Sequence, residues 1–407
     1  MPRGTNLPRV GNYNQSIVLD AVRRSAAGLS QVQIIELTGL SKQTVSNIAR
    51  RLLDAGLLRS HGVTIAGRGK PRTTLRVDAT SLYAVGVHLD PSLVTVVILD
   101  LGGKAVASDE AVGVLDKDPV ASIGRVAAMV EALIVTAGID RSTLAGVGIA
   151  SPGPLDYTAG ALVDPPWLEG WNGLKIAEAA SSQLDLPVLV DKDTIAITTG
   201  ECWSRDHHDG RSLVFIYLGT GIGSAVAHDG TVMRGATHNA GEIGHLLVDV
   251  EGTLCPCGRR GCLGRASDPS SLVQDARDLG VLDFEVGALS YESVGEHLNE
   301  LCDLADRGNA QAQALLNRAA NAIAEATRIL VGIHDANLVV FGGPFWARLQ
   351  TYYLGVVTDH LAASPEPRTA PTRVEGTVMG NAVGAVGAAS LVLDNTFSTK
   401  LSAYVNA

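Results

Sequence analysis

One histidine and three cysteines lie close together in the middle of the chain. His245, Cys255, Cys257 and Cys262 fall within an 18-residue window, which holds three of the five cysteines of the sequence. One imidazole and three thiolates form a ligand set typical of structural zinc sites, which are tetrahedral and closed. The spacing predicts a bound zinc ion; the alternative is a cluster of buried or reactive thiols. These residues alone leave open whether the ion serves structure, catalysis or ligand binding.

The elements that must position this window belong to a long, glycine-rich chain. Its 407 residues exceed one ordinary domain, so we expect two or three compact units. Hydrophobic residues make up 46% and charged residues 18%, with 45 glycines, as in α/β proteins with many tight turns. The sequence predicts neither a membrane span nor a signal peptide. We therefore expect a cytoplasmic protein, in which clustered cysteines indicate a metal rather than disulfides.

Charge is distributed unevenly along the chain. Residues 1–76 hold 12 Lys and Arg against 3 Asp and Glu, whereas the remaining residues are strongly acidic, giving the whole chain a net charge of −10. Such segregation suits a protein whose first part meets phosphates while the rest does not.

The basic first part has the pattern of a helix-turn-helix. Apolar residues at helical spacing predict a helix over residues 14–25, and a second short helix is expected between the cap Ser30 and Gly39. A third helix follows the turn at 38–44 and is expected to be the recognition helix. Its exposed side chains are of the types that bond base edges and phosphates. The predicted DNA contacts are Ser41, Lys42, Gln43, Thr44, Ser46, Asn47 and Arg50.

A basic turn follows the recognition helix. Residues 57–78 alternate like two short strands around a tip that contains Arg68, Gly69, Lys70 and Arg72. We interpret this hairpin as a wing whose cations enter a minor groove or contact phosphates. The alternative is an ordinary three-helix subdomain with a solvated, charged loop. Helix spacing, polar face, wing and charge together predict that double-stranded DNA is a partner.

From about residue 82 the sequence alternates between strands and helices. Two successive sheets with crossing helices predict a two-lobed α/β body with a cleft between the lobes. We expect a winged helix-turn-helix over residues 1–78, a first lobe over 79–187 and a second lobe over 188–379 that carries the zinc window. A glycine-rich helix at 380–400 is expected to join the first lobe.

Several motifs of this body resemble the ROK family, named for repressors, open reading frames and sugar kinases. They are GIASPGPLD at 148–156, GW at 170–171, DKD at 191–193, GTGIGS at 219–224, GEIGH at 241–245, CPCGRRGC at 255–262 and FGG at 341–343. With a winged helix in front, the chain is similar to the transcriptional-repressor branch, which includes the xylose, glucose and N-acetylglucosamine repressors. The resemblance implies an actin/hexokinase-like (ribonuclease H-like) fold, a zinc ion on the four window residues and a sugar cleft between the lobes.

The resemblance also implies effector-binding residues. Matching positions are Gly153, Asp193, Glu242 and His245, where carboxylates would accept hydrogen bonds from sugar hydroxyls. Two positions depart from the family pattern: Lys192 replaces an Asn, and Gly264 replaces a Glu. We include Lys192 among the effector residues and hypothesise that the cleft is shifted towards positive charge, with Arg265 adding to it, and accepts an anionic or phosphorylated sugar, or an unusual sugar with fewer hydroxyls. The alternative is that Lys192 pairs internally with Asp191 or Glu242 and sugar binding is lost.

One half of the phosphate grip of a sugar kinase is missing. The family's kinases need a DxGGT turn near the start of the first lobe, but residues 88–92 read HLDPS, where Pro91 also removes an amide donor. The second glycine turn, Gly219–Gly223, remains, as does Asp193 at the position of the catalytic base. We therefore predict no phosphoryl transfer and no catalytic residue.

The function predicted from these features is DNA-binding transcriptional regulation, most simply repression. A homodimer or homotetramer is expected to bind a palindromic operator, and a sugar or sugar-derivative effector to control that binding. The alternatives are a sugar kinase with an attached DNA-binding domain, and an activating or ligand-independent regulator with a degenerate cleft. Because four protein ligands leave no open position on a zinc ion, the predicted cofactor is structural Zn²⁺.

Overall fold

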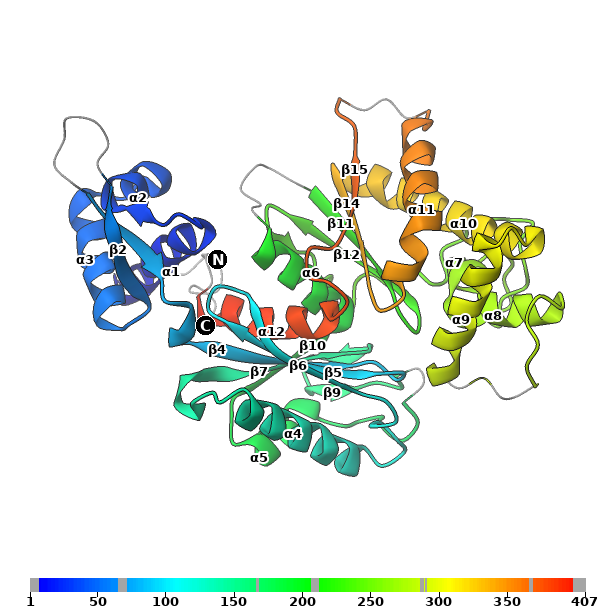
Figure 1. The fold of residues 1–407 in the computed structure, drawn as a ribbon, viewed down its shortest axis with the longest axis horizontal. Helices are drawn as coiled ribbons and strands as arrows, with labels where there is room; N and C mark the ends of the chain where they lie inside the picture. The colour runs from blue at the N-terminus through cyan, green and yellow to red at the C-terminus, as the bar shows by residue number, and fades with distance from the viewer. Residues whose placement is uncertain are drawn as a thin grey trace.

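The fold comes from a computed structural model of the chain, which describes residues 7–64, 72–165, 168–205, 212–285, 289, 291–365 and 369–397. Three bodies follow one another in Figure 1: a small blue domain at the N-terminus, a first lobe in cyan and blue-green, and a second lobe from green to orange. The red C-terminal helix returns to the first lobe.

The N-terminal domain is a winged helix-turn-helix. Its helices are α1 (Leu7–Arg24), α2 (Gln31–Thr38) and α3 (Lys42–Asp54), and its small sheet has the order β1 (Leu29–Ser30), β3 (Arg72–Val77), β2 (Leu58–Thr64). Ser30 and Gln33 form a capping box at the start of α2, and Gly39 ends that helix in the left-handed conformation. The Ser41 side chain then accepts from the Thr44 N–H and starts α3. These local signals fix the tight turn between the two helices, as predicted.

The first lobe is built on a five-stranded sheet. After the 3₁₀ turn η1 (Ala79–Ser81), its strands have the order β10 (Val188–Lys192), β7 (Leu144–Ser151), β4 (Tyr83–Leu89), β5 (Val94–Asp100), β6 (Ala105–Ala111). Helices α4 (Pro119–Thr136) and α5 (Ile176–Leu184) cover one face, and η2 (Arg141–Thr143) leads into β7. The expected boundary at residue 188 is wrong, because β10 pairs in parallel with β7 along its whole length. The first sheet therefore extends to Lys192.

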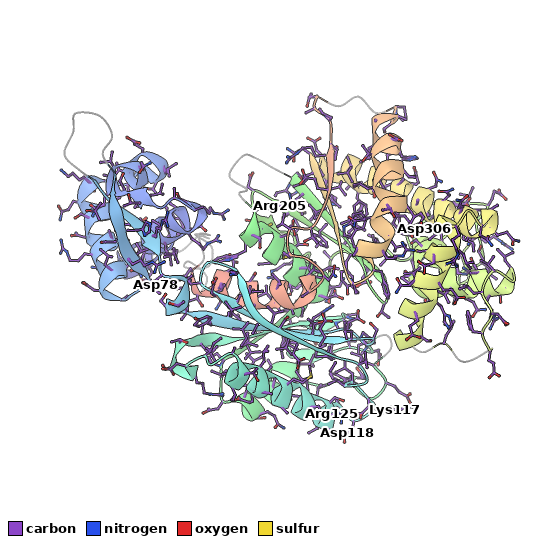
Figure 2. All side chains as sticks on the ribbon, viewed as in Figure 1. Asp78, Lys117, Asp118, Arg125, Arg205 and Asp306 are labelled. Atoms are coloured by element: carbon purple, nitrogen blue, oxygen red, sulfur yellow. The ribbon has the colours of Figure 1, made fainter. Side chains whose placement is uncertain are left out.

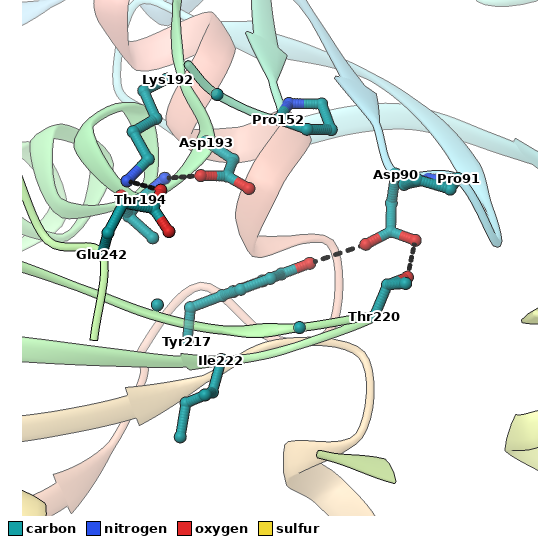
Figure 3. Close-up of a pocket in the computed structure, with 13 residues that line it drawn as sticks. Asp90, Pro91, Pro152, Lys192, Asp193, Thr194, Tyr217, Thr220, Ile222 and Glu242 are labelled. Carbon is teal, nitrogen blue, oxygen red and sulfur yellow. Dashed lines mark hydrogen bonds and ion pairs between the residues drawn. The ribbon is translucent and has the colours of Figure 1, made fainter. Parts of the chain in front are cut away.

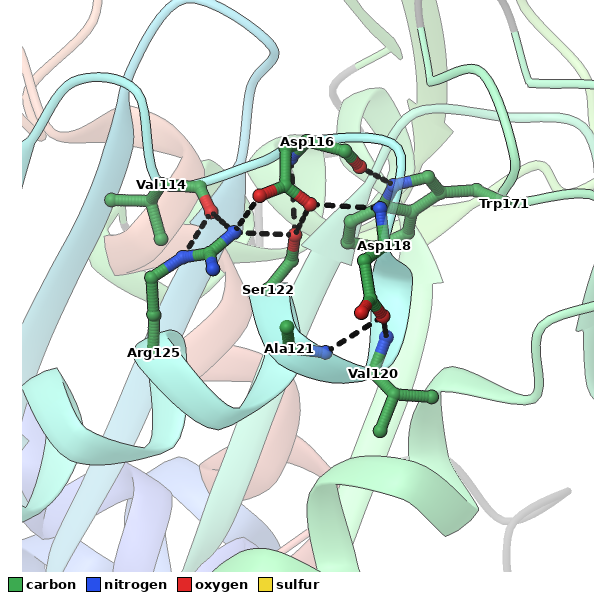
Figure 4. Close-up of polar contacts among 8 residues, drawn as sticks. All are labelled: Val114, Asp116, Asp118, Val120, Ala121, Ser122, Arg125 and Trp171. Atoms are coloured by element: carbon green, nitrogen blue, oxygen red, sulfur yellow. Dashed lines mark hydrogen bonds and ion pairs between the residues drawn. The ribbon is translucent and has the colours of Figure 1, made fainter.

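Among the described residues, one helix, α4, is long and apolar enough to cross a membrane by those two measures alone. Its apolar face, which includes Ile123, Val126 and Val130, is buried against the first sheet. Asp118 caps its first turn by accepting from two backbone amides (Figure 4). The packing is that of a core helix on a sheet.

The GW motif of the turn-rich passage has a structural role. Trp171 is fully buried, and its indole N–H donates a 2.7 Å hydrogen bond to the backbone oxygen of Asp116 (Figure 4). Gly170 has a φ of 89°, and a Cβ there would lie 2.5 Å from the backbone oxygen of Lys117. Arg125 closes the network by donating to Val114 and Asp116. This passage, which includes the short pair β8 (Leu155–Asp156) and β9 (Ala161–Leu162), is thereby anchored to the loop before α4.

The second lobe has a five-stranded sheet of its own, with helices stacked on one face. The strand order is β13 (Thr231–Val232), β12 (Ile222–His228), β11 (Ser212–Leu218), β14 (Leu338–Gly342), β15 (Arg373–Gly376). The covering helices are α7 (Leu263–Ser267), α8 (Pro269–Asp278), α9 (Tyr291–Asp306), α10 (Ala310–His334) and α11 (Trp346–Ala362).

Two helices fill the space between the sheets: α6 (Asp193–Ser204) and α12 (Val383–Thr396). The C-terminal helix packs on β4 and β7 of the first lobe at very short range. A Cβ on Gly86 would lie 1.9 Å from the backbone oxygen of Ala385, and one on Gly148 would lie 1.8 Å from that of Ala388. Because only glycine permits this approach, β4 and β7 carry glycines where α12 crosses them.

Candidate functional site

A pocket opens between the lobes, next to the N-terminus of α6. Its volume is about 110 Å³, and it is bounded by the ends of β4, β7 and β10 on one side and by the β11–β12 turn on the other (Figure 3). Four of the five predicted effector residues, Gly153, Lys192, Asp193 and Glu242, line it, whereas His245 is not among the lining residues. The other lining residues are Asp90, Pro91, Pro152, Thr194, Tyr217, Thr220, Gly221, Ile222 and Gly223.

Lys192 is buried and paired with groups of the protein itself. Only 2% of its side chain is exposed, and its ammonium group lies 2.5 Å from the Glu242 carboxylate and 3.4 Å from the backbone oxygen of Ala240. The internal pairing that we considered as the alternative is therefore present.

The hypothesis of a positively charged cleft is wrong. Arg265 is paired with Asp275 at 2.6 Å and does not line the pocket. The pocket contains the carboxyl groups of Asp90, Asp193 and Glu242 against the one ammonium group of Lys192. Its lining thus offers more acceptors than cations.

Asp193 is the first residue of α6 and is held at the pocket floor. Its carboxylate accepts a 2.6 Å hydrogen bond from the Thr194 N–H. Burial raises the pKa of this carboxyl to about 6, although the Lys192 charge opposes the rise. Near neutral pH it can accept a hydrogen bond from a ligand hydroxyl, and in mild acid it can donate one.

Asp90 links the two lobes across the pocket. Its carboxylate accepts from the Thr220 hydroxyl at 2.5 Å and from the Tyr217 hydroxyl at 3.2 Å, both in the second lobe (Figure 3). Within its own turn it accepts from the N–H and hydroxyl of Ser92. Sequence reasoning noted the lost glycines of this turn but missed the bridge, because its partners lie about 130 residues away in the chain.

The bridge changes what the two turns can bind. In a phosphate grip, backbone amides of both turns must face an anion. Here a carboxylate lies between the turns and engages the hydroxyl of Thr220 in the surviving glycine turn. Pro91 has no N–H, and the adjoining His88 is buried against Tyr217, with ring centroids 6.0 Å apart. A carboxylate, rather than a backbone amide, therefore faces the surviving glycine turn from the first lobe.

The predicted metal ligands converge at the start of the second lobe's helical layer. The ligand atoms of His245, Cys255, Cys257 and Cys262 all lie within 4.8 Å of one another. The Cys255 sulfur lies 3.7 Å from Nδ1 of His245, and the Cys257 and Cys262 sulfurs are 3.6 Å apart. A tetrahedral zinc ion with ordinary bond lengths requires edges of about 3.5–3.8 Å. The donor set and its spacing both fit a metal ion.

Tight turns bring these ligands together. The Cys255 N–H donates to the Arg259 backbone oxygen at 2.7 Å, which closes the CPCGRR turn. Gly261 has a φ of 72°, and a Cβ there would lie 1.4 Å from the backbone oxygen of Asp249. Hydrogen bonds from the backbone and side chain of Arg259 lower the pKa of the Cys257 thiol to about 6, whereas burial raises the pKa of the neighbouring Cys262 thiol to about 11.

A carboxylate that the sequence analysis did not identify lies beside Gly264. A Cβ at this glycine would be 2.9 Å from an Asp268 carboxylate oxygen, so Asp268 fills the space next to it. Burial raises the pKa of Asp268 to about 6, and the nearby His245 opposes the rise. Position 264 has no carboxylate of its own, but the Asp268 carboxylate at the start of α8 lies beside it.

The predicted DNA-binding face of α3 is accessible. Ser41, Lys42, Gln43 and Arg50 are exposed, whereas Val45, Ile48, Ala49 and Leu52 are buried beneath them. Thr44, Ser46 and Asn47 are half-buried, and the Gln43 amide donates to the Asn47 side chain at 3.3 Å. Arg68, Gly69 and Lys70 of the predicted wing lie outside the described residues, and Arg72 is the first residue of β3.

Comparisons with known proteins agree with this architecture. Residues 94–395 match the ROK family, and residues 7–63 match the MarR family. The xylose repressor of Caldicellulosiruptor bescii is 23% identical over 77% of this chain and 79% of its own. A glucokinase of Halalkalibacterium halodurans is 27% identical over 62% of this chain and 77% of its own. The crystal structure of a ROK family transcriptional regulator, a homologue of the Escherichia coli Mlc protein, matches 98% of this chain and 100% of its own with a TM-score of 0.75 and 19% identity, which shows a shared fold.

Proposed function

Because the chain belongs to the ROK family, we propose that it is a DNA-binding transcriptional repressor whose operator affinity is set by a small molecule in the interlobe pocket. The observation that carries this proposal is the union of a winged helix-turn-helix with a ROK body in one chain. The similarity to a xylose repressor and the full-length match to a ROK transcriptional regulator support it.

For DNA binding, we propose that α3 enters the major groove. Lys42, Gln43, Asn47 and Arg50 would contact base edges and phosphates, with Ser41, Thr44 and Ser46 at the helix start positioning the backbone. Arg68, Gly69, Lys70 and Arg72 of the wing would add contacts to the backbone or minor groove. A homodimer or homotetramer would place two such helices on a palindromic operator in the cytoplasm.

For the effector, we propose a neutral, polyhydroxylated molecule of the sugar class. The carboxylates of Asp193 and Glu242 offer hydrogen-bond acceptors, and Lys192 is already neutralised by Glu242. An anionic sugar would meet the carboxyl groups of Asp90, Asp193 and Glu242 with no unpaired cation among the lining residues. Gly153 lies against the Lys192 side chain and has no side chain that would narrow the pocket.

We propose that the cluster of His245, Cys255, Cys257 and Cys262 holds a structural zinc ion. The ion would tie the segment that carries Glu242 to the loop that precedes α7. His245 presents Nδ1 to Cys255, so its part would be to orient this segment rather than to line the pocket.

A sugar kinase with an attached DNA-binding domain is the second candidate, favoured by the retained Asp193 and by the similarity to a glucokinase. The Asp90 bridge argues against it, because a carboxylate faces the turn that would hold the phosphates. An activating or ligand-independent regulator is the third candidate.

Selection of bound fragments from a random DNA library would identify the operator, and gel shift with D-glucose, D-xylose and N-acetyl-D-glucosamine would follow. Release of the operator by a neutral sugar supports the proposal. Tighter binding would indicate co-repression or activation, and the absence of any selected sequence would refute the proposal.

A further inference from the structure

Helix α6 runs from the interlobe pocket to the DNA-binding domain. Its first residue is Asp193, on the pocket floor, and its last turn contains Trp203 and Ser204. Twelve residues of α-helix span about 18 Å. Arg205 follows the last residue of α6 and lies where the second lobe faces the N-terminal domain (Figure 2). A single rigid element thus has one end at the pocket and the other at α1.

The first contact of α1 with this end involves Trp203. The Arg23 guanidinium lies over the indole ring at 3.9 Å from its centroid, which is a cation–π contact. Trp203 is buried in an apolar cluster with Leu99 and Leu101 of the first lobe and with α12. Arg23 therefore contacts a ring that is packed with the first lobe.

The second contact of α1 involves Arg205. The Arg24 guanidinium donates a 2.6 Å hydrogen bond to the Arg205 backbone oxygen. The Arg205 side chain is itself held by the second lobe: it donates to Glu375 at 2.5 Å and to the Gly376 backbone oxygen at 3.0 Å, both on β15. Arg24 therefore contacts a residue that is fixed to the second lobe.

One carboxylate joins these two contacts on the α1 side. Asp20 is buried and pairs with Arg23 at 2.8 Å and with Arg24 at 2.7 Å. Because both arginines share this partner, neither can move far without the other. The Asp20–Arg23–Arg24 group therefore fastens α1 to the end of α6 as one unit.

We propose that the end of α6, formed by Trp203 and Arg205, is a docking site that positions the DNA-binding domain, and that α1 follows the movement of α6 there. Arg23 contacts this helix end through the Trp203 ring, and Arg24 contacts it through the Arg205 backbone oxygen. A change in the pocket then alters the orientation of α1 and of the recognition helix packed against it. The inference rests on the proposed function only for its biological purpose, since the junction itself involves neither DNA nor effector.

Hydrogen–deuterium exchange of the full-length protein tests this coupling without DNA or sugar. Two perturbations act at the cleft: Thr220→Val removes the hydrogen bond to Asp90, and Glu242→Gln removes the charge that pairs with Lys192. Each should change amide exchange over residues 12–24 of α1 by roughly threefold or more. Thr237→Val and Glu251→Gln, at exposed positions, are the matched controls and should leave that exchange unchanged.

The junction variants Trp203→Leu and Arg24→Gln identify the route. In each background, the cleft substitutions should still change exchange around residues 217–222 but no longer change it over residues 12–24. Unchanged exchange over residues 12–24 in both single cleft variants would overturn the coupling. A response that persists in both junction backgrounds would overturn the assigned docking site. Failure to select an operator would refute the proposed repressor function. It would not affect the exchange experiments, which use neither DNA nor sugar.

Discussion

The Thr220 hydroxyl donates a 2.5 Å hydrogen bond to the Asp90 carboxylate, joining the turn after β4 to the turn after β11. This bond places a negative charge between the two turns that hold phosphates in the family's kinases. Together with the bond from the Tyr217 hydroxyl to the same carboxylate, it ties the two lobes together at the pocket.

We expect the purified protein to release no ADP from ATP in the presence of D-glucose, D-xylose or N-acetyl-D-glucosamine. The Asp90 carboxylate repels phosphate, and Pro91 offers no amide. A coupled ADP assay, with a bacterial glucokinase as positive control, measures this. Sugar-dependent turnover above the buffer rate would show that the enzyme assignment is wrong.

Glu242→Gln should lower the free energy of unfolding by roughly 1–3 kcal/mol, because it leaves the buried Lys192 ammonium without its carboxylate. The lower part of this range is expected, since 66% of the Glu242 side chain is exposed. Urea denaturation provides the measurement, and Glu251→Gln is the exposed control. Adding Lys192→Met to Glu242→Gln should recover most of the loss. Equal stability of the Glu242→Gln and Glu251→Gln variants would show that the pair contributes little.

Asp193 should make stability depend on pH between about 4 and 6. Burial raises its pKa to about 6 from the ordinary 3.8, so in this window the folded protein binds a proton that the unfolded chain has released. The free energy of unfolding therefore falls as pH rises through the window, by up to about 3 kcal/mol from this group. Asp193→Asn should flatten the profile, whereas Asp54→Asn, at an exposed position, should not. Asp268, whose pKa is also about 6, would account for the slope that remains.

The cysteine cluster should contain one zinc ion per chain when measured by plasma mass spectrometry. Cys257→Ser should lower the zinc content, whereas Cys302→Ala, at a buried cysteine outside the cluster, should not. Chelation should lower the unfolding temperature of the body and weaken any effector response, because the ion ties the Glu242 segment to the loop before α7. Loss of amide protection in the winged helix before the body would contradict this placement of the metal.

Arg68→Ala and Arg72→Ala should weaken binding to all DNA sequences and reduce the salt dependence of binding by about one counterion each. Fluorescence anisotropy at several salt concentrations measures both effects. Arg307→Ala, at an exposed position of the body, is the charge-matched control. Unchanged affinity in both wing variants would show that this hairpin does not contact DNA.

Local sequence signals identified the parts of this protein that are built from neighbouring residues. The caps at Ser30 and Gly39 delimit α2, and the cysteine spacing identifies the metal cluster, because both depend on contacts within about 20 residues. Pairings between distant residues could not be found in this way. Residues 188–190 form the short apolar run of a strand, but nothing in them shows that β7 is their partner.

The charge of the pocket illustrates the same limit. Lys192 read alone indicated a cationic site, yet Glu242, 50 residues later, neutralises it. The Asp90–Thr220 bond likewise depends on how the lobes close, which is set by the packing of α6 and α12 between the sheets. Residue types predicted which side chains could line the pocket. The fold determines which of their charges are neutralised by a partner.

The position of α12 has a consequence for the synthesis of the protein. The first-lobe sheet is formed by residues 83–192, but one of its faces is covered by Ala385, Ala389 and Val392 near the end of the chain. While the ribosome translates the second lobe, that face has no covering helix of its own. The first lobe can therefore complete its core only after nearly the whole chain has emerged, whereas the N-terminal domain, whose core comes mainly from residues 18–75, can fold long before.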